Sequence, residues 1–206
     1  MAAKREPRLE DRLALHAWMN SLFGYAGTRE MLTDLEKAAE GFDGAGRSYV
    51  LERLLSRGQE LKIPEADLER YDANVRGHLA AINRRRPEPV TLRYFQHVAA
   101  LYTEVFLDRR ARDPEALAAE LNAFAARREE PVVFEADDLD KLAFWMATGS
   151  GKTLLMHLNY RQFLHYEGEP PDNVLLITPN AGLTAQHLEE MRMSGIPCER
   201  FSAAES

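Results

Sequence analysis

The sequence predicts an α/β fold in which an all-helical N-terminal region precedes the first part of a parallel sheet. Two observations support this prediction. The first 87 residues contain one amphipathic pattern of helical spacing after another. From residue 142 onward, short apolar runs alternate with helical patterns in the order strand, loop, helix, strand, helix, which is how a parallel sheet with crossover helices begins. A length of 206 residues suits one sizeable domain or two small ones.

Four helices are expected in the N-terminal region, and two prolines end it. Glycines interrupt the apolar patterns after the first and second helices, and Pro64 lies near the first turn of the fourth. Pro87-Glu88-Pro89 bars helix continuation, so we divide the chain into residues 1–87 and 88–206. The four expected helices run from Arg8 to Phe23, from Met31 onward, from Tyr49 to Leu55 and from Pro64 to Arg86.

The second region is expected to start with two helices and to continue as a sheet. One helix is predicted over 92–110. Asp113-Pro114 then has the pattern of an N-cap followed by proline at the first helical position, which opens a helix through Ala126. Two short apolar runs are typical of strands buried on both faces, 142–146 and 174–177. The helices expected after these strands span 152–166 and 183–193.

Composition and charge exclude several classes of protein. Apolar residues make up 45% and charged residues 29% of the chain, which argues against wholesale disorder. A net charge of -7 excludes an argument for nucleic-acid binding from overall charge, although a local basic face remains compatible with it. Cys198 is the only cysteine, no apolar stretch is long enough to cross a bilayer, and the first seven residues lack the apolar core of a secretory signal. We therefore expect a soluble cytoplasmic protein.

The segment Ala147-Thr148-Gly149-Ser150-Gly151-Lys152-Thr153 carries the clearest chemical signal. It lies between a predicted strand and a predicted helix, where backbone N–H groups and a helix N-terminus can face a chain of phosphates. The two glycines let the backbone approach the phosphates, Lys152 can reach the β- and γ-phosphates, and Thr153 can place its hydroxyl on Mg²⁺. The pattern G-x-x-x-x-G-K-[ST] would require glycine at Met146, so the match is incomplete.

Two further signals flank this loop in the sequence. Thr178-Pro179-Asn180 ends the second predicted strand, where ligands gather in open α/β sheets, and Gln186 follows in the next helix. These side chains could grip the phosphates of a nucleic-acid strand, or the segment could be a proline turn with a polar helix cap. Upstream, Gln96 in the run 92–96 offers an amide whose donor and acceptor suit the edge of adenine.

Together these motifs resemble the superfamily 2 helicases and translocases. The loop 147–153 is similar to their motif I, which commonly opens with alanine, and 174–180 with Gln186 resembles their motif Ia. The run 92–96 is similar to the Q-motif of the restriction-enzyme branch, the type III restriction subunits and UvrB-like N-terminal helicase domains. About 55 residues separate Gln96 from Lys152, more than is usual in compact members of the superfamily. The resemblance covers residues 91–206.

The resemblance implies a RecA-like fold and ATP-driven movement on nucleic acid, DNA rather than RNA, in restriction or phage defence. It implies that Gln96 reads adenine and that the Walker A loop, Ala147 to Thr153, binds ATP, with Lys152 as the catalytic residue and Thr153 on Mg²⁺. Thr178, Pro179, Asn180 and Gln186 would contact the nucleic acid. Hydrolysis further needs a carboxylate pair on a later strand and an arginine from a second lobe. We therefore expect an amino-terminal piece of a longer enzyme, inactive by itself.

Two other functions fit parts of the sequence. A P-loop ATPase of another class could act on protein or small molecules, and residues 1–87 could form a helical module that docks a partner subunit without catalysis of its own. The apolar run 132–138, which ends in Asp137 and Asp138, has the pattern of a Mg²⁺-carboxylate strand. It precedes the loop, whereas that strand normally follows it, so we interpret it as a solvated turn.

Overall fold

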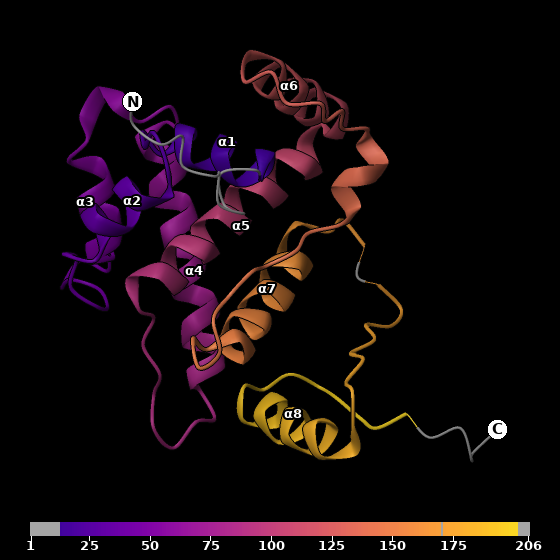
Figure 1. Ribbon diagram of the computed structural model, residues 1–206. Coiled ribbons are helices and arrows are strands. Elements are labelled where there is room, and N and C mark those ends of the chain that lie inside the picture. The colour runs from indigo at the N-terminus through magenta and orange to yellow at the C-terminus, as the bar shows by residue number, and fades with distance from the viewer. Residues whose placement is uncertain (1–12, 170, 202–206) are drawn as a thin grey trace, which may run out of the picture.

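The computed structural model describes residues 13–169 and 171–201, and this part of the chain is helical (Figure 1). The described residues form eight α-helices, and short 3₁₀ turns, η2 (Gly58–Glu60) and η3 (Ala136–Asp140), lie between some of them. None of the described helices is long and apolar enough to cross a membrane. The helices are α1 (Ala14–Leu22), α2 (Thr28–Leu35), α3 (Tyr49–Leu55), α4 (Glu65–Asn83), α5 (Tyr94–Arg112), α6 (Pro114–Arg127), α7 (Lys152–Tyr166) and α8 (Ala181–Met193).

Local capping explains why several helices begin where the sequence predicts. The Ser48 hydroxyl accepts a hydrogen bond from the Leu51 N–H at 2.9 Å and starts α3. Asp113 caps α6 in the same way, accepting from the Ala116 N–H at 2.9 Å, with proline at the first helical position. The predictions for α3, α6 and α7 are confirmed within a residue at each end. The expected helix start at Arg8 lies outside the described residues, and α1 begins at Ala14.

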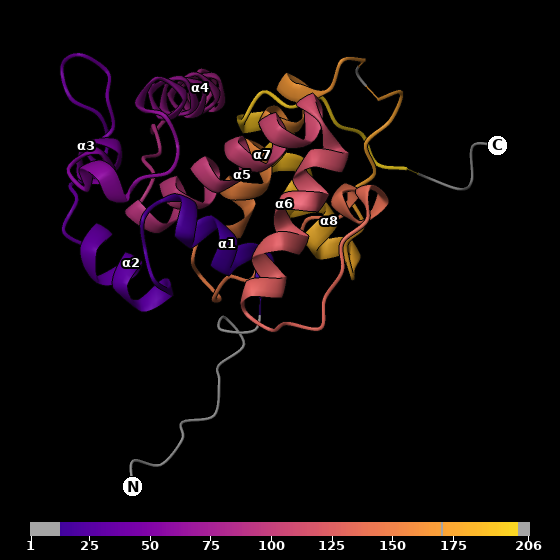
Figure 2. The ribbon, with the colours of Figure 1, turned by 90° about the horizontal axis from the view of Figure 1, so that it is seen from above.

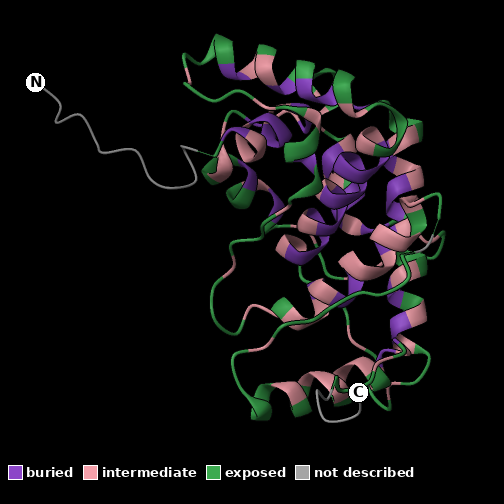
Figure 3. Cartoon of the chain, turned by 90° about the vertical axis from the view of Figure 1, so that its right-hand side faces the viewer, coloured by how far each residue is buried: buried purple, intermediate pink, exposed green. Residues whose placement is uncertain are grey.

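The core surrounds α5, which is buried along most of its length. Figure 2 shows α5 and α7 in the middle of the molecule with α1, α4 and α6 around them. The buried apolar cluster runs from Trp18 on α1 to Leu158 on α7, and so includes residues on both sides of Pro87-Glu88-Pro89. The buried part is concentrated at the centre of Figure 3, whereas α8 is half-buried or exposed throughout. The domain division at residue 87 stays a prediction.

The predicted parallel sheet is wrong for the part of the chain that the structure describes. Neither 142–146 nor 174–177 belongs to a strand, and the β-pairing found is a single bridge between Phe42 and Ser48. Both segments were expected to be buried on both faces, yet Trp145 is 84% exposed and Ile177 is 82% exposed. Short apolar runs are compatible with a strand, but a strand exists only when a neighbouring strand takes up its backbone groups, and such pairing is not local. Because no neighbouring strand pairs with them in the described part of the chain, both segments form irregular connections between helices.

Candidate nucleotide-binding site

The loop 147–153 forms a tight turn at the start of α7. Gly149 has φ 78° and Gly151 has φ 81°, the left-handed region in which a side chain is strained. Ser150 closes the turn, because its N–H donates to the Ala147 carbonyl at 3.3 Å and its hydroxyl donates to the same oxygen at 2.7 Å. Helix α7 then starts at Lys152, with the Leu155 N–H donating to the Gly151 carbonyl at 3.1 Å. The left-handed backbone of the turn therefore explains why glycine suits positions 149 and 151.

The turn presents a row of N–H donors. Within the described part of the chain, no hydrogen bond takes up the N–H groups of Gly151, Lys152 or Thr153. These groups belong to the first turn of a helix, where the donors have no acceptor inside the helix and the helix dipole is positive. A phosphate chain supplies acceptors of the right charge at such a place. The residues present therefore fit the group that the sequence motif implies.

Lys152 lies over the loop that precedes it. Its Nζ donates hydrogen bonds to the carbonyl oxygens of Met146 at 3.0 Å and Ala147 at 2.7 Å, and the side chain is exposed. A phosphate oxygen would be a charged acceptor in place of these neutral ones. Lys152 also lines a mainly apolar cavity of about 420 Å³ between α5, α7 and the segment 139–146. The Lys152 ammonium therefore lies at the turn where a phosphate chain would bind.

Gln96 lies beside the loop although 54 residues separate it from Ser150. It occupies the first turn of α5 and is only 6% exposed. Its Oε1 accepts a hydrogen bond from the Arg93 N–H at 2.9 Å, and its Nε2 donates to the Ser150 carbonyl at 2.8 Å. The packing of α5 against α7 brings the two residues together. Contact of Gln96 with adenine stays a prediction, and in this structure its amide contacts the loop through Nε2 and the start of its own helix through Oε1.

The segment 178–180 forms the start of α8. Asn180 caps that helix, its Oδ1 accepting from the Leu183 N–H at 2.9 Å. The hydroxyls of Thr178 and Thr184 lie 2.6 Å apart, so they share a hydrogen bond. Pro179, Asn180 and Gln186 are exposed. The polar cap that the sequence allowed is present, and a nucleic-acid contact by these exposed groups stays a prediction.

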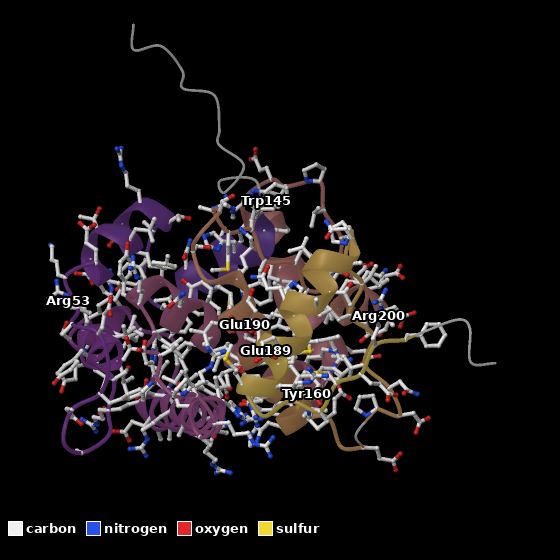
Figure 4. The ribbon with its side chains drawn as sticks, turned by 90° about the horizontal axis from the view of Figure 1, so that it is seen from below. Arg53, Trp145, Tyr160, Glu189, Glu190 and Arg200 are labelled. Carbon is white, nitrogen blue, oxygen red and sulfur yellow. The ribbon has the colours of Figure 1, made fainter. Side chains whose placement is uncertain are left out.

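Helix α8 is attached to the rest of the molecule through Ser194 at its C-terminal end. Arg86 donates to the Ser194 hydroxyl at 2.8 Å and also pairs at 3.0 Å with Glu190. Figure 4 labels Glu190 on α8. Because the hydroxyl accepts from Arg86, its own hydrogen is free to donate to Nδ1 of His157, 2.8 Å away. His157 is fully buried, and burial together with Arg86 lowers its pKa to about 4. A neutral His157 therefore helps to hold α8 against α7.

The carboxylates at the end of the run 132–138 lie in an exposed turn. Asp137 and Asp138 belong to η3, where Asp138 Oδ2 accepts from the Glu135 N–H at 3.0 Å, so the interpretation as a solvated turn is confirmed. In the described residues no group of three or more His, Cys, Asp or Glu side chains is arranged to hold a metal ion. Thr153 is half-buried in the first turn of α7. Thr153 is the one residue assigned to Mg²⁺, and that role stays a prediction.

A buried polar network between α5 and α7 was not found from the sequence. Glu104 is fully buried, and it accepts hydrogen bonds from Gln162 at 2.8 Å and from Tyr166 at 2.7 Å. Gln162 also donates to the Ala100 carbonyl at 2.8 Å. Burial raises the pKa of Glu104, against the opposing effect of these hydrogen bonds. These hydrogen bonds hold α7, and with it the loop, against α5. Because the paired residues lie some 60 positions apart in the sequence, no local sequence pattern predicts them.

The loop, the helix that follows it and three backbone N–H groups without an acceptor in the described residues form an arrangement that a phosphate group fits. The family described as "Type III restriction enzyme, res subunit" matches residues 91–205, more than half of the chain. The chain belongs to this family, which confirms the resemblance to the restriction-enzyme branch of the superfamily 2 helicases. Comparison with curated proteins gives no significant match, and comparison with solved structures gives none either.

Proposed function

We propose that this chain binds ATP with Mg²⁺ through the loop 147–153 and supplies the ATP-binding part of a nucleic-acid translocase or helicase, acting on DNA. One observation carries the proposal. The N–H groups of Gly151, Lys152 and Thr153 have no acceptor in the described part of the chain and stand at the positive end of α7. Membership of the restriction res-subunit family supports the class of reaction.

Each residue of the loop has a separate part in this proposal. The Lys152 ammonium would leave the carbonyls of Met146 and Ala147 for the β- and γ-phosphates, where it offsets their charge in the transition state. The Thr153 hydroxyl would be a ligand of Mg²⁺, which supplies charge neutralisation of the phosphates when it is bound. Ala147, Thr148, Gly149 and Ser150 would form the wall of the phosphate site.

Contact with DNA is proposed for the start of α8. Pro179, Asn180 and Gln186 are exposed there, and the helix presents its N-terminus to solvent. A helix N-terminus with a threonine and an amide next to it suits a backbone phosphate. Docking of a partner subunit by residues 1–87 remains a prediction from the helical pattern of that region, and a role in phage defence remains a prediction from the resemblance.

The test is ATP hydrolysis by the full-length enzyme, with and without DNA, for the wild type and for Lys152→Ala. The proposal expects DNA to raise the rate and Lys152→Ala to abolish it in both conditions. A rate that is indifferent to DNA but lost in Lys152→Ala would favour a P-loop ATPase of another class. A rate that Lys152→Ala leaves intact would contradict the site itself.

A further inference from the structure

We propose that the end of α4 and the second half of α7 form a further contact with DNA, in which Arg84, Arg85 and Arg161 bind phosphates of the backbone. We call these three side chains the arginine cluster. The inference rests on the proposed function, because it takes DNA as the ligand. It adds residues that belong neither to the loop 147–153 nor to the start of α8.

Segments far apart in the sequence bring the arginine cluster together. Arg84 is the C-cap of α4 and Arg85 follows it, whereas Arg161 belongs to α7. A Cβ placed on Gly195, just after α8, would lie 3.7 Å from Arg161 Nη2 and 3.8 Å from Arg85 Cδ. Arg161 also donates from Nη2 to the Ser194 carbonyl at 2.9 Å. Side chains from α4 and α7 therefore pack against the same turn.

The arginine cluster carries positive charge that its surroundings do not neutralise. Arg84 and Arg85 are exposed, and within the described part of the chain their side chains form no hydrogen bond or ion pair. The carboxylate of Glu190 pairs with the neighbouring Arg86 at 3.0 Å. Elsewhere in the molecule, Arg110 pairs with two carboxylates. The guanidinium groups of Arg84 and Arg85 are therefore available to an anion from outside.

The surroundings of Arg161 show that these charges are held together against their own repulsion. Burial lowers the pKa of the Arg161 guanidinium, and the positive charge of Arg84 lowers it further. In contrast, a hydrogen bond to Asp140 raises the pKa of Arg110. Nε of Arg161 is also buried without an acceptor among the described residues. A phosphate group beside Arg84 would supply the negative charge that the cluster lacks.

The exposure of the cluster favours a chain of phosphates over a single phosphate ion. A guanidinium can bind a phosphate through two parallel N–H groups, but one such contact on an open surface is weak in water. Contacts along a nucleic acid add up, because each of them releases a counterion from the backbone. Exposed arginines side by side therefore suit the phosphodiester backbone.

Helix α8 sets the spacing between this contact and the one proposed above. The arginine cluster lies by Gly195, just past the end of α8, and Asn180 caps the start of the same helix. With 13 residues, α8 is about 20 Å long. A DNA duplex rises about 3.4 Å per base pair, so about six base pairs cover this length. A duplex only slightly longer can therefore reach both contacts.

The test measures the affinity of the full-length enzyme for a labelled duplex of about 20 base pairs, by fluorescence anisotropy at several salt concentrations and without nucleotide. Arg84→Ala/Arg85→Ala removes two charges from the cluster. The control, Arg29→Ala/Arg127→Ala, removes two exposed arginines from α2 and α6, so the net charge changes equally. Figure 1 shows α2 and α6 away from α8.

We expect the cluster variant to bind the duplex about tenfold more weakly, and the slope of log affinity against log salt to fall by about 2. The control is expected to keep the affinity and the slope of the wild type. Equal losses in both variants would assign the effect to net charge and overturn the proposal. An unchanged affinity in the cluster variant would overturn it as well.

A second variant separates the charge of the cluster from its packing. Arg84→Lys/Arg85→Lys keeps both charges but loses the planar guanidinium groups. We expect this variant to keep the salt slope of the wild type and to bind the duplex more tightly than Arg84→Ala/Arg85→Ala does. A lysine variant as weak as the alanine variant would show that charge is not what the cluster supplies, and would overturn the proposal.

The outcome is distinguishable from failure of the proposed function. Because no nucleotide is present, failure of the ATP site leaves the measurement unaffected. If Asn180→Asp lowers the DNA affinity and Arg84→Ala/Arg85→Ala does not, this inference fails and the proposed contact at the start of α8 stands. If the wild type does not bind DNA, the proposed function fails, and this inference fails with it.

Discussion

Lys152 donates a hydrogen bond to the carbonyl oxygen of Ala147 at 2.7 Å, so the ammonium lies on the turn that begins its own helix. The bond joins an exposed charged donor to a neutral acceptor, and water competes for both partners. Such a contact contributes little to folding and is easily exchanged for a contact with a phosphate, whose charge strengthens the bond. Substitution of Lys152 is therefore expected to change ligand binding strongly and the free energy of unfolding only slightly.

Lys152→Ala is expected to lower ATP hydrolysis by the full-length enzyme at least about a hundredfold, because the transition-state charge loses its ammonium partner. The same change is expected to alter the free energy of unfolding by less than about 0.5 kcal/mol, since the side chain is exposed. Steady-state kinetics and urea denaturation measure the two effects. Lys141→Ala, which removes another exposed lysine from the same part of the chain, is the control and is expected to change neither.

Gly151→Ala is expected to destabilise the protein by about 1 to 3 kcal/mol and to weaken nucleotide binding. The backbone at φ 81° strains any residue with a Cβ, and the new methyl group would lie 2.3 Å from Gln96 Nε2. Urea denaturation checks the loss. Gly168→Ala is the control, because no atom beyond its chain neighbours lies within 4 Å of its Cβ position and its φ lies outside the left-handed region. Equal stability of the two variants would show that the turn does not hold Gly151 in this conformation.

Asn180→Asp separates the helix cap from the proposed DNA contact. Asp caps a helix as well as Asn does, so the free energy of unfolding is expected to stay within about 0.5 kcal/mol of the wild type. The added negative charge repels a backbone phosphate, and DNA affinity is expected to fall about tenfold. Asn180→Ala, in contrast, is expected to cost about 1 kcal/mol of stability. Fluorescence anisotropy with labelled DNA checks the affinity, and an unchanged value for Asn180→Asp would remove Asn180 from the interface.

Stability is expected to fall as the pH decreases from 7 to 5, in part because of His157. Its pKa is about 4 in the folded protein, lowered by burial and Arg86, and about 6.5 in an unfolded chain. Between these values the unfolded state binds a proton that the folded state does not, so acid favours unfolding by about 1 to 2 kcal/mol at pH 5. Burial also lowers the pKa of His78 to about 4, which adds a similar effect.

His157→Asn should reduce this pH dependence, because the Asn oxygen can still accept from the Ser194 hydroxyl but does not titrate. Urea denaturation at pH 7, 6 and 5 measures the slope for both proteins. A variant as pH-sensitive as the wild type would exclude His157 as a source of the effect.

The helices and the turn of the loop could be predicted from the sequence because their signals are local. Asp113-Pro114 caps and opens α6, and the two glycines before Lys152 mark the turn before α7. The sheet could not be predicted reliably, since 142–146 and 174–177 carry strand-like composition but strand pairing depends on residues far away in the sequence. The contact of Gln96 with Ser150 depends in the same way on how α5 packs against α7, which no spacing of 54 residues reveals.

The account as a whole is tested most directly by titrating the ¹⁵N-labelled chain with ATP and Mg²⁺ and following its amide resonances. If the loop 147–153 cradles a triphosphate, the largest shifts fall on Gly149, Gly151, Lys152 and Thr153, and Lys152→Ala removes them. Shifts that fall elsewhere, or none at millimolar ATP, would contradict it.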